Sequence, residues 1–168
     1  MTYSSLQIRP LASSDCSRGH LDILSVLTVA PQLTSEVYQC KPIPLVSACS
    51  PKATFNELKS AKNTYFIVVI LQKSTDKVNS RAIPARICRL IFQIVASGTI
   101  VLERKLLRNA GLIGHVEDIA VSKAMQGRKL GLKLINTLDA IGAAMGCYKI
   151  ILDCSKDNIR KLLTSTFR

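Results

Sequence analysis

The sequence predicts one mixed α/β domain over residues 1–168. The chain is 48% hydrophobic, which is enough for a packed core and too apolar for a disordered chain. Apolar and β-branched stretches of strand length alternate with stretches whose apolar residues recur at helical spacing. The expected order is a strand, a helix, a short helix, three strands, a long helix and a last strand, which is a mixed α/β pattern.

The N-terminal residues predict the first strand and helix. LQIRPL, residues 6–11, has the composition of a strand and ends near its proline. The segment after it predicts a helix over 14–29, because Leu21 and Leu24 fall on one helical face and Asp15 can cap the start.

Prolines interrupt the next part of the chain. Three of them lie between residues 38 and 52, which argues against regular structure there. A short helix is expected at 54–62. TYFIVVIL, residues 64–71, is β-branched and aromatic and predicts a strand in the interior of the sheet.

Two further strands are predicted over residues 94–107 and 114–122. Gly98 is a candidate bulge position in the first of them. Glu117 and Asp118 interrupt the apolar pattern of the second. Taken alone, these two carboxylates are as compatible with an exposed strand edge as with a functional site.

The strongest helix is predicted over residues 126–145. Its apolar residues recur at i, i+4, i+8 and i+11, namely at Leu130, Leu134, Leu138 and Ile141. Gly146 is a typical helix terminator. The apolar run CYKIILDC at 147–154 then predicts the last strand.

The chain is strongly basic, with a formal charge of +12 from 23 basic and 11 acidic residues. This charge is compatible with nucleic acid, an anionic membrane or a small anionic ligand as the partner. Residues 73–92 hold five basic residues against one acidic residue, and residues 155–168 hold four against one. More than half of the net charge therefore lies in these two stretches.

Several classes of protein are excluded. No apolar run reaches the roughly 18 residues that span a bilayer, and the N-terminus has no basic start followed by an apolar block. The six cysteines are scattered without a Cys-x-x-Cys pair, and His20 and His115 have no second ligand at metal-binding spacing. We therefore expect reduced thiols, no metal and a cytoplasmic protein.

Residues 121–132, VSKAMQGRKLGL, point most directly to a ligand. A strand is expected to end at Val121 and a helix to open at Gln126. Glycines allow close backbone approach and a helix N-terminus offers unpaired N–H donors, so the turn suits a pyrophosphate. It matches neither the P-loop nor the Gly-x-Gly-x-x-Gly pattern. Arg128 and Lys129 add positive charge, although both are also compatible with a solvated helix face.

Further motifs occur in order along the chain: Glu103-Arg104-Lys105, then GHVEDIAV at 114–121, Gln126-Gly127, and GCYKIILDC at 146–154. The strand, turn and helix around the glycines resemble the coenzyme A-binding motif of the GNAT acetyltransferase superfamily. The wider set is similar to the glucosamine 6-phosphate N-acetyltransferase family. This similarity covers residues 94–158 and, more weakly, residues 6–36.

The resemblance implies a GNAT fold, with a mixed, mostly antiparallel central sheet flanked by helices. It also implies an enzyme that transfers an acetyl group from acetyl-CoA to the amine of D-glucosamine 6-phosphate. The product, N-acetyl-D-glucosamine 6-phosphate, lies on the route to UDP-N-acetylglucosamine. In this family the transfer is direct, without an acyl-enzyme, and the enzymes are homodimers whose sites use both subunits.

The resemblance also implies a set of site residues. Glu117 and Asp118 would orient the amine and help to remove its proton. The acetyl-CoA-binding residues would be Ile119, Ala120, Val121, Gln126, Gly127, Arg128, Lys129, Leu130, Gly131, Leu132, Asp153 and Asn158. The sugar-phosphate site would be lined by Thr28, Lys105, Leu106, Leu107, Arg108, Glu117, Asp118, Ile119, Tyr148 and Lys149.

Two segments depart from the family. Residues 73–92 are an atypical basic insertion, and residues 159–168 stand where the family has a tyrosine-bearing helix and a last strand. Both departures suggest an altered reading frame or a retained intron.

Two alternative functions stay open. One is an impaired isoform or pseudoenzyme that binds acetyl-CoA. The other is a basic nucleic-acid-binding protein, which is the weaker alternative because only 5% of the residues are aromatic and Trp is lacking.

Overall fold

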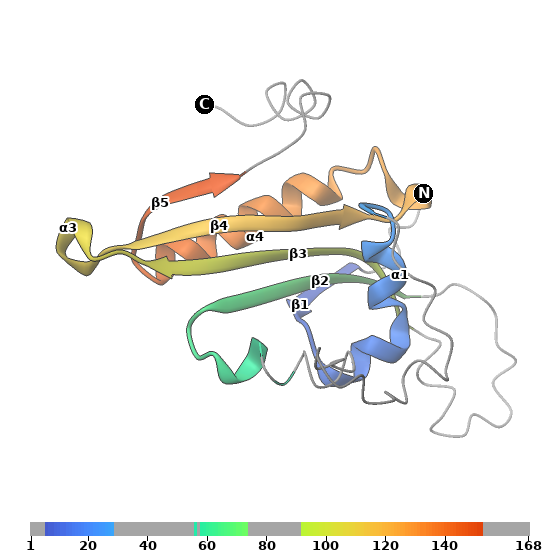
Figure 1. Ribbon diagram of the computed structural model, residues 1–168. Helices are drawn as coiled ribbons and strands as arrows, with labels where there is room; N and C mark the ends of the chain where they lie inside the picture. Colours follow the sequence, from blue (N-terminus) through green and yellow to red (C-terminus); the bar gives the residue numbers. More distant parts are fainter. Residues whose placement is uncertain (1–5, 29–55, 57, 74–91, 153–168) are drawn as a thin grey trace, which may run out of the picture.

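The structure, a computed structural model, describes residues 6–28, 56, 58–73 and 92–152 (Figure 1). A five-stranded sheet forms its centre. The strands are β1 (Leu6–Pro10), β2 (Tyr65–Lys73), β3 (Phe92–Arg104), β4 (Leu112–Val121) and β5 (Cys147–Leu152). They lie side by side in chain order, antiparallel from β1 to β4, with β5 parallel to β4. The predicted mixed, mostly antiparallel sheet is confirmed.

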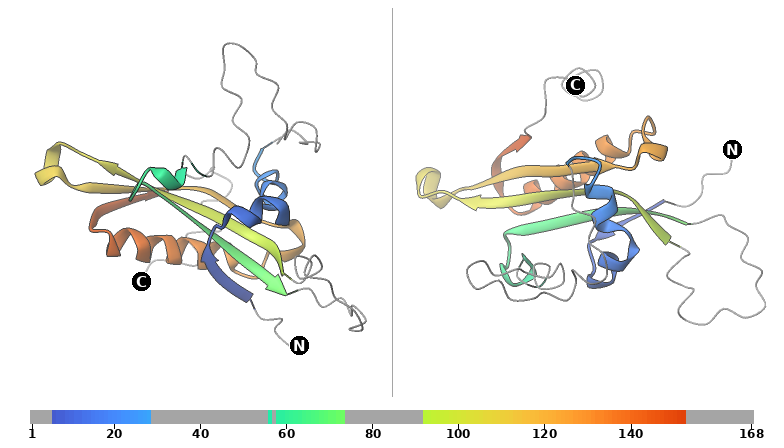
Figure 2. Two further views of the ribbon diagram at one scale, coloured as in Figure 1. Left: turned by 90° about the horizontal axis from the view of Figure 1, so that it is seen from below. Right: turned by 45° about the vertical axis from the view of Figure 1, so that its right-hand side comes forward.

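The long helix α4 (Leu130–Ala144) covers one face of the sheet (Figure 2). Leu130, Leu134 and Leu138 are its most buried side chains, at 3%, 0% and 0% exposure. They pack with sheet residues such as Ile70 and Ile100 into the larger of two apolar clusters. The predicted apolar stripe is therefore confirmed, because residues four apart share the face that meets the sheet.

The predicted start of this helix at Gln126 is wrong. Gly127 and Lys129 both have positive φ, of 77° and 58°, which an α-helix cannot contain. The helix therefore begins at Leu130 and leaves the four preceding residues as an irregular turn. Its predicted end is confirmed, because Gly146, at φ 82°, donates its N–H to the Ala143 carbonyl oxygen at 3.0 Å.

The opposite face of the sheet is covered near the N-terminus by η1 (Ser13–Arg18) and α1 (His20–Leu24), as the views in Figure 2 show. A single helix over 14–29 is therefore wrong. Gly19 separates the two short helices because it takes a left-handed conformation, with φ 82° and ψ 23°. Ile23 of α1 packs in the second apolar cluster, which contains Val69 and Leu71 of β2.

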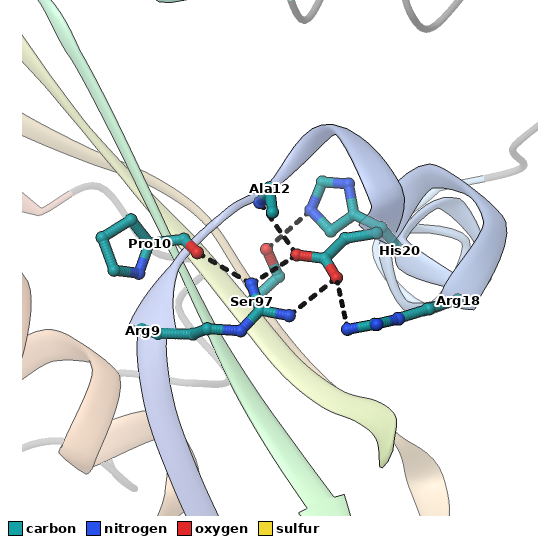
Figure 3. Close-up of polar contacts among 7 residues, drawn as sticks. Arg9, Pro10, Ala12, Arg18, His20 and Ser97 are labelled. Carbon is teal, nitrogen blue, oxygen red and sulfur yellow. Dashed lines mark hydrogen bonds and ion pairs between the residues drawn. The ribbon is translucent and has the colours of Figure 1, made fainter. Parts of the chain in front are cut away.

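Asp15 connects β1 to these short helices through contacts with Arg9, Ala12 and Arg18, three residues that Figure 3 labels. Its fully buried carboxylate accepts hydrogen bonds from Arg9 at 2.6 and 2.8 Å and from the Ala12 N–H at 2.9 Å, and Arg18 Nη1 lies 3.4 Å away. Burial opposes the negative charge, but the bonds from Arg9 and Ala12 prevail and hold the pKa of Asp15 below its usual value. Asp15 does cap this segment, from inside the first turn rather than before it.

The remaining strand boundaries differ slightly from the predictions. β2 matches the predicted strand at 64–71 with a small shift, whereas β3 ends at Arg104 instead of 107. The chain turns there through α3 (Leu107–Ala110), in which residues 108–110 all have left-handed φ near 56°. Residues this far in the left-handed region cannot extend a strand, so the hairpin closes before its predicted end.

Several predicted segments fall wholly or partly outside the described residues. These are the irregular stretch at 38–52, most of the 73–92 insertion, the end of the last strand at 153–154, and the tail at 159–168. The two ends of the insertion are described: Lys73 ends β2, Phe92 begins β3, and the two residues pair across the sheet. Residues 58–60 are helical, within the predicted helix at 54–62. Along the described ranges no helix is long and apolar enough to cross a membrane.

The substitution Asp15→Ala should lower the free energy of unfolding by about 3 kcal/mol, because it leaves two partly buried guanidinium groups without their shared carboxylate. Asp22→Ala, at an exposed carboxylate on α1, is the matched control and should change it by under about 0.5 kcal/mol. Urea denaturation of both variants measures the difference. Equal stabilities would contradict the role assigned to Asp15.

Candidate functional site

A bulge in β4 exposes the two carboxylates that interrupt its apolar pattern. Ser97 pairs with Ala120 and Thr99 pairs with Glu117, so Gly98 alone faces two residues of β4. The predicted bulge at Gly98 is therefore placed in the wrong strand: Gly98 lies opposite the bulge, and the extra residue belongs to β4. Asp118 absorbs it by taking a left-handed conformation with φ 55°.

The bulge changes which side chains of β4 reach solvent. Glu117 and Asp118 are both exposed, whereas Ala120 is buried against the α1 face. Gly98 makes the arrangement possible, because a Cβ atom there would lie 2.6 Å from Ile119 Cδ1 and 3.1 Å from Leu138 Cδ1. A bulge at such a point aims side chains that a regular strand would direct elsewhere.

Beyond the bulge, β4 has a free side among the described residues. β5 pairs with β4 only from Leu112 to Val116, so the backbone of residues 117–121 has no β5 partner in this part of the structure. Figure 1 shows β4 continuing past the end of β5. Unpaired strand backbone offers N–H and C=O groups to an extended, amide-containing ligand.

The turn between β4 and α4 lies at the same end of β4. It contains the short helix η3 (Lys123–Met125) and then residues 126–129, all four exposed. No atom lies within 4 Å of a Cβ atom placed on Gly127, so the backbone there is open to approach. The first N–H groups of an α-helix have no partner within the helix, and Arg128 and Lys129 stand directly before them. The residues predicted from the motif therefore do form an open, positively charged helix N-terminus.

The β3–β4 hairpin carries the other predicted contacts. Lys105 donates to Glu103, which also contacts His115 Nε2 at 3.0 Å. Both interactions, that of Lys105 first, hold the pKa of Glu103 below its usual value. Arg108 lies over the ring of Tyr148, 5.9 Å from the ring centre, which brings α3 and β5 together.

Two apolar residues at the tip of the hairpin have no cover among the described residues. Leu106 is 100% exposed and Leu107 is 78% exposed. Leu112 to Glu117 spans five residues of strand, or about 17 Å, so the tip lies far from the bulge along β4. Within one subunit, the predicted sugar-binding residues of the hairpin therefore lie in two separate groups, one at the tip and one at the bulge.

The other predicted residues are distributed as follows. Thr28 is exposed in the turn after α1, and Lys149 is exposed on β5. Gly131 lies at the start of α4, where a Cβ atom would lie 3.8 Å from the Val121 side chain, so the helix start packs on the end of β4. Asp153 and Asn158 lie outside the described residues.

One polar contact at this site was not singled out from the sequence. His20 Nε2 lies 2.9 Å from Ser97 Oγ, and both residues are buried (Figure 3). Burial lowers the pKa of His20, and the charges of Asp15 and Asp118 offset this only in part. The two residues are 77 positions apart, so no local pattern could have connected them.

The described residues contain no group of three His, Cys, Asp or Glu side chains that could hold a metal ion. The thiol of Cys147 is free, and burial raises its pKa. A raised pKa leaves little thiolate at neutral pH, so Cys147 is a poor nucleophile.

The sheet, the bulge and the open helix start have the architecture of a GNAT acetyltransferase, and residues 55–162 match the acetyltransferase (GNAT) family. The chain is 34% identical over 155 residues to glucosamine 6-phosphate N-acetyltransferase 1 of Dictyostelium discoideum, covering 92% of this chain and 80% of the relative. It is 32% identical over 152 residues to glucosamine 6-phosphate N-acetyltransferase of Arabidopsis thaliana, covering 90% and 83%.

A solved structure gives the same result. The crystal structure of glucosamine-6-phosphate N-acetyltransferase from Arabidopsis thaliana superposes with a TM-score of 0.70 at 29% identity, and the match covers 98% of this chain and 93% of that one. This chain belongs to the glucosamine 6-phosphate N-acetyltransferase family of the GNAT acetyltransferases.

Stability should fall as the pH is lowered from 7 towards 5, in part because of His20. The unfolded residue takes up a proton near the ordinary histidine pKa of 6.5, while the buried ring, with its lowered pKa, stays neutral. His20→Leu should therefore lose less stability over this range than the unsubstituted chain. Urea denaturation at several pH values measures this, and identical slopes for the two proteins would contradict it.

Proposed function

We propose that this chain transfers an acetyl group from acetyl-CoA to the amine of glucosamine 6-phosphate. The observation that carries the proposal is the β4 bulge, where two exposed carboxylates stand beside a free stretch of strand backbone and an open, basic helix start. The strand backbone can hydrogen-bond the amide-containing arm and the thioester of acetyl-CoA, and the helix start can bind its pyrophosphate. A carboxylate can accept the proton that the attacking amine loses. The names of the relatives give the substrate.

The acetyl-CoA side of the site is built largely from backbone. The N–H and C=O groups of Ile119, Ala120 and Val121 would pair with the amide-containing pantetheine arm along the free side of β4. Residues 126–132 would bind the pyrophosphate, through unpaired N–H groups at the start of α4 and the side chains of Arg128 and Lys129. Asp153 and Asn158 stay predicted contacts. Acetyl-CoA supplies the activated acetyl group.

The residues expected to face the sugar would accept the proton that the amine loses. Glu117 would accept a proton from the amine as its nitrogen attacks the thioester carbonyl, and Asp118 would orient the sugar. The C–S bond would then break, and CoA would leave as a thiolate that takes up a proton from solvent. A backbone N–H at the bulge would hydrogen-bond the carbonyl oxygen as negative charge develops on it. No covalent enzyme intermediate is needed, in keeping with the raised pKa of Cys147.

A second copy of the chain would complete the sugar site. About 17 Å of strand separates the hairpin tip, which carries Lys105 and Arg108, from Glu117, so one subunit is poorly placed to use both groups on one hexose phosphate. A homodimer in which the hairpin tip of one subunit reaches the bulge of the other would join them. It would also bury Leu106 and Leu107, whose exposure suits an interface.

The product would serve UDP-N-acetylglucosamine synthesis, and a cytoplasmic location stays a prediction from the scattered cysteines. Outside residues 73–92 and 155–168, the charge that suggested nucleic acid falls from +12 to +5. This smaller positive charge suits two anionic substrates.

Mixing the purified full chain with acetyl-CoA and glucosamine 6-phosphate should release free thiol. Glu117→Gln should lower kcat by about 100-fold or more, because the neutral amide cannot accept the amine proton. Asp139→Asn, at an exposed carboxylate on α4, is the control and should keep full activity. Binding of acetyl-CoA without thiol release would instead favour an impaired isoform.

Arg128→Ala should raise the KM for acetyl-CoA about tenfold, because one charge-assisted hydrogen bond to the pyrophosphate is lost. The KM for glucosamine 6-phosphate should not change. Lys133→Ala, one turn further along α4 and also exposed, is the matched control. Equal effects at both positions would mean that overall charge, rather than the helix start, attracts the pyrophosphate.

A further inference from the structure

One contact between α1 and the sheet is polar, although the core around it is apolar. His20 Nε2 and Ser97 Oγ lie 2.9 Å apart at 7% and 1% exposure. The neighbouring cluster contains Ile23, Ile94 and Ala120. Both polar groups lose water to make one hydrogen bond, so the pair adds little net stability. What it does add is a defined distance and direction between α1 and β3.

The hydrogen bond joins the sheet directly beside the bulge. Ser97 pairs with Ala120, the register pair that adjoins the bulge on one side. Burial lowers the pKa of His20, and among the described residues the charges of Asp15 and then Asp118 act in the opposite direction without reversing it. The contact therefore ties α1 to the part of β4 that presents the carboxylates.

At its other end α1 leads into the turn that carries Thr28. Backbone hydrogen bonds continue past the helix, from the Ser25, Val26 and Leu27 N–H groups to carbonyl oxygens of the helix. The Ser25 hydroxyl also donates to the Asp22 carbonyl oxygen at 2.6 Å. Because these bonds join α1 and the turn, a displacement of α1 moves the turn with it.

We propose that His20 is a positioning residue which, through Ser97, sets the place of α1 and its following turn relative to the β4 bulge. The distance from Thr28 to Glu117 and Asp118, and with it the fit of the amino sugar, depends on this hydrogen bond. The inference rests on the proposed function, and it takes Thr28, a sugar contact that the family resemblance implies, together with Glu117 and Asp118 as sugar-binding groups of one subunit. His20 itself touches neither substrate.

Steady-state kinetics of His20→Leu, Ser97→Ala and the double variant test the proposal. Each single substitution should raise the KM for glucosamine 6-phosphate about tenfold and leave the KM for acetyl-CoA unchanged. The double variant should be no worse than either single one, since both remove the same hydrogen bond. His20→Gln, whose amide can still donate to Ser97, should recover most of the loss. Additive effects, or equal changes in both KM values, would overturn the proposal.

A matched control separates positioning from loss of packing. Ile23→Val removes a methylene from the same helix, leaves the His20–Ser97 pair in place, and should lower the urea midpoint of unfolding. It should leave both KM values unchanged. A rise in the sugar KM equal to that of His20→Leu would mean that general loosening of α1, and not the hydrogen bond, is responsible.

Amide hydrogen exchange keeps the inference testable if the proposed function fails. A chain that releases no thiol with glucosamine 6-phosphate contradicts the proposed function. In that case the rate of amide hydrogen exchange at residues 21–28 still measures how firmly α1 and its following turn are held. Equally faster exchange in His20→Leu and Ser97→Ala, with recovery in His20→Gln, supports the positioning contact. Unchanged exchange in the two variants overturns it.

Discussion

The bulge in β4 opposite Gly98 is the constraint on which the rest of the site depends. One extra residue in β4, absorbed by the left-handed conformation of Asp118, turns two carboxylates towards solvent. The absence of a side chain at Gly98 leaves room for Ile119 and Leu138 on the α4 side. The bulge thus serves both faces of the sheet: it exposes polar groups on one and allows α4 to pack closely on the other.

Two other features of the site follow from the same strand. β4 runs on beyond the end of its pairing with β5, and its chain then turns through Gly127 and Lys129 into α4. The free strand backbone and the unpaired N–H groups of the helix start are therefore adjacent. The His20–Ser97 contact on the opposite face adjoins the bulge as well, so that α1 takes its position from the same point.

Much of the geometry at the candidate site could be predicted from the sequence because its signals are local, whereas the binding roles of its residues stay predictions. The leucines of α4, the glycines before it and the Glu117-Asp118 pair were all evident from spacing and residue type. Local patterns did not indicate where α4 begins, because positive φ at Lys129 is a property of the folded turn. Nor did they indicate that Gly19 would divide the N-terminal helix, since glycine is also tolerated inside helices.

Residue patterns alone predicted the mixed α/β class, the core face of α4 and, through ordered motifs, the family. The pyrophosphate-binding role of the turn before α4 stays a prediction. The folded chain was needed to show that the extra residue lies in β4, that Asp15 is shared by Arg9 and Arg18, and that His20 contacts Ser97. The distance between the hairpin tip and the bulge could likewise be seen only in the folded structure. Periodicity and capping act over a few residues, whereas register and buried polar contacts depend on segments that only folding brings together.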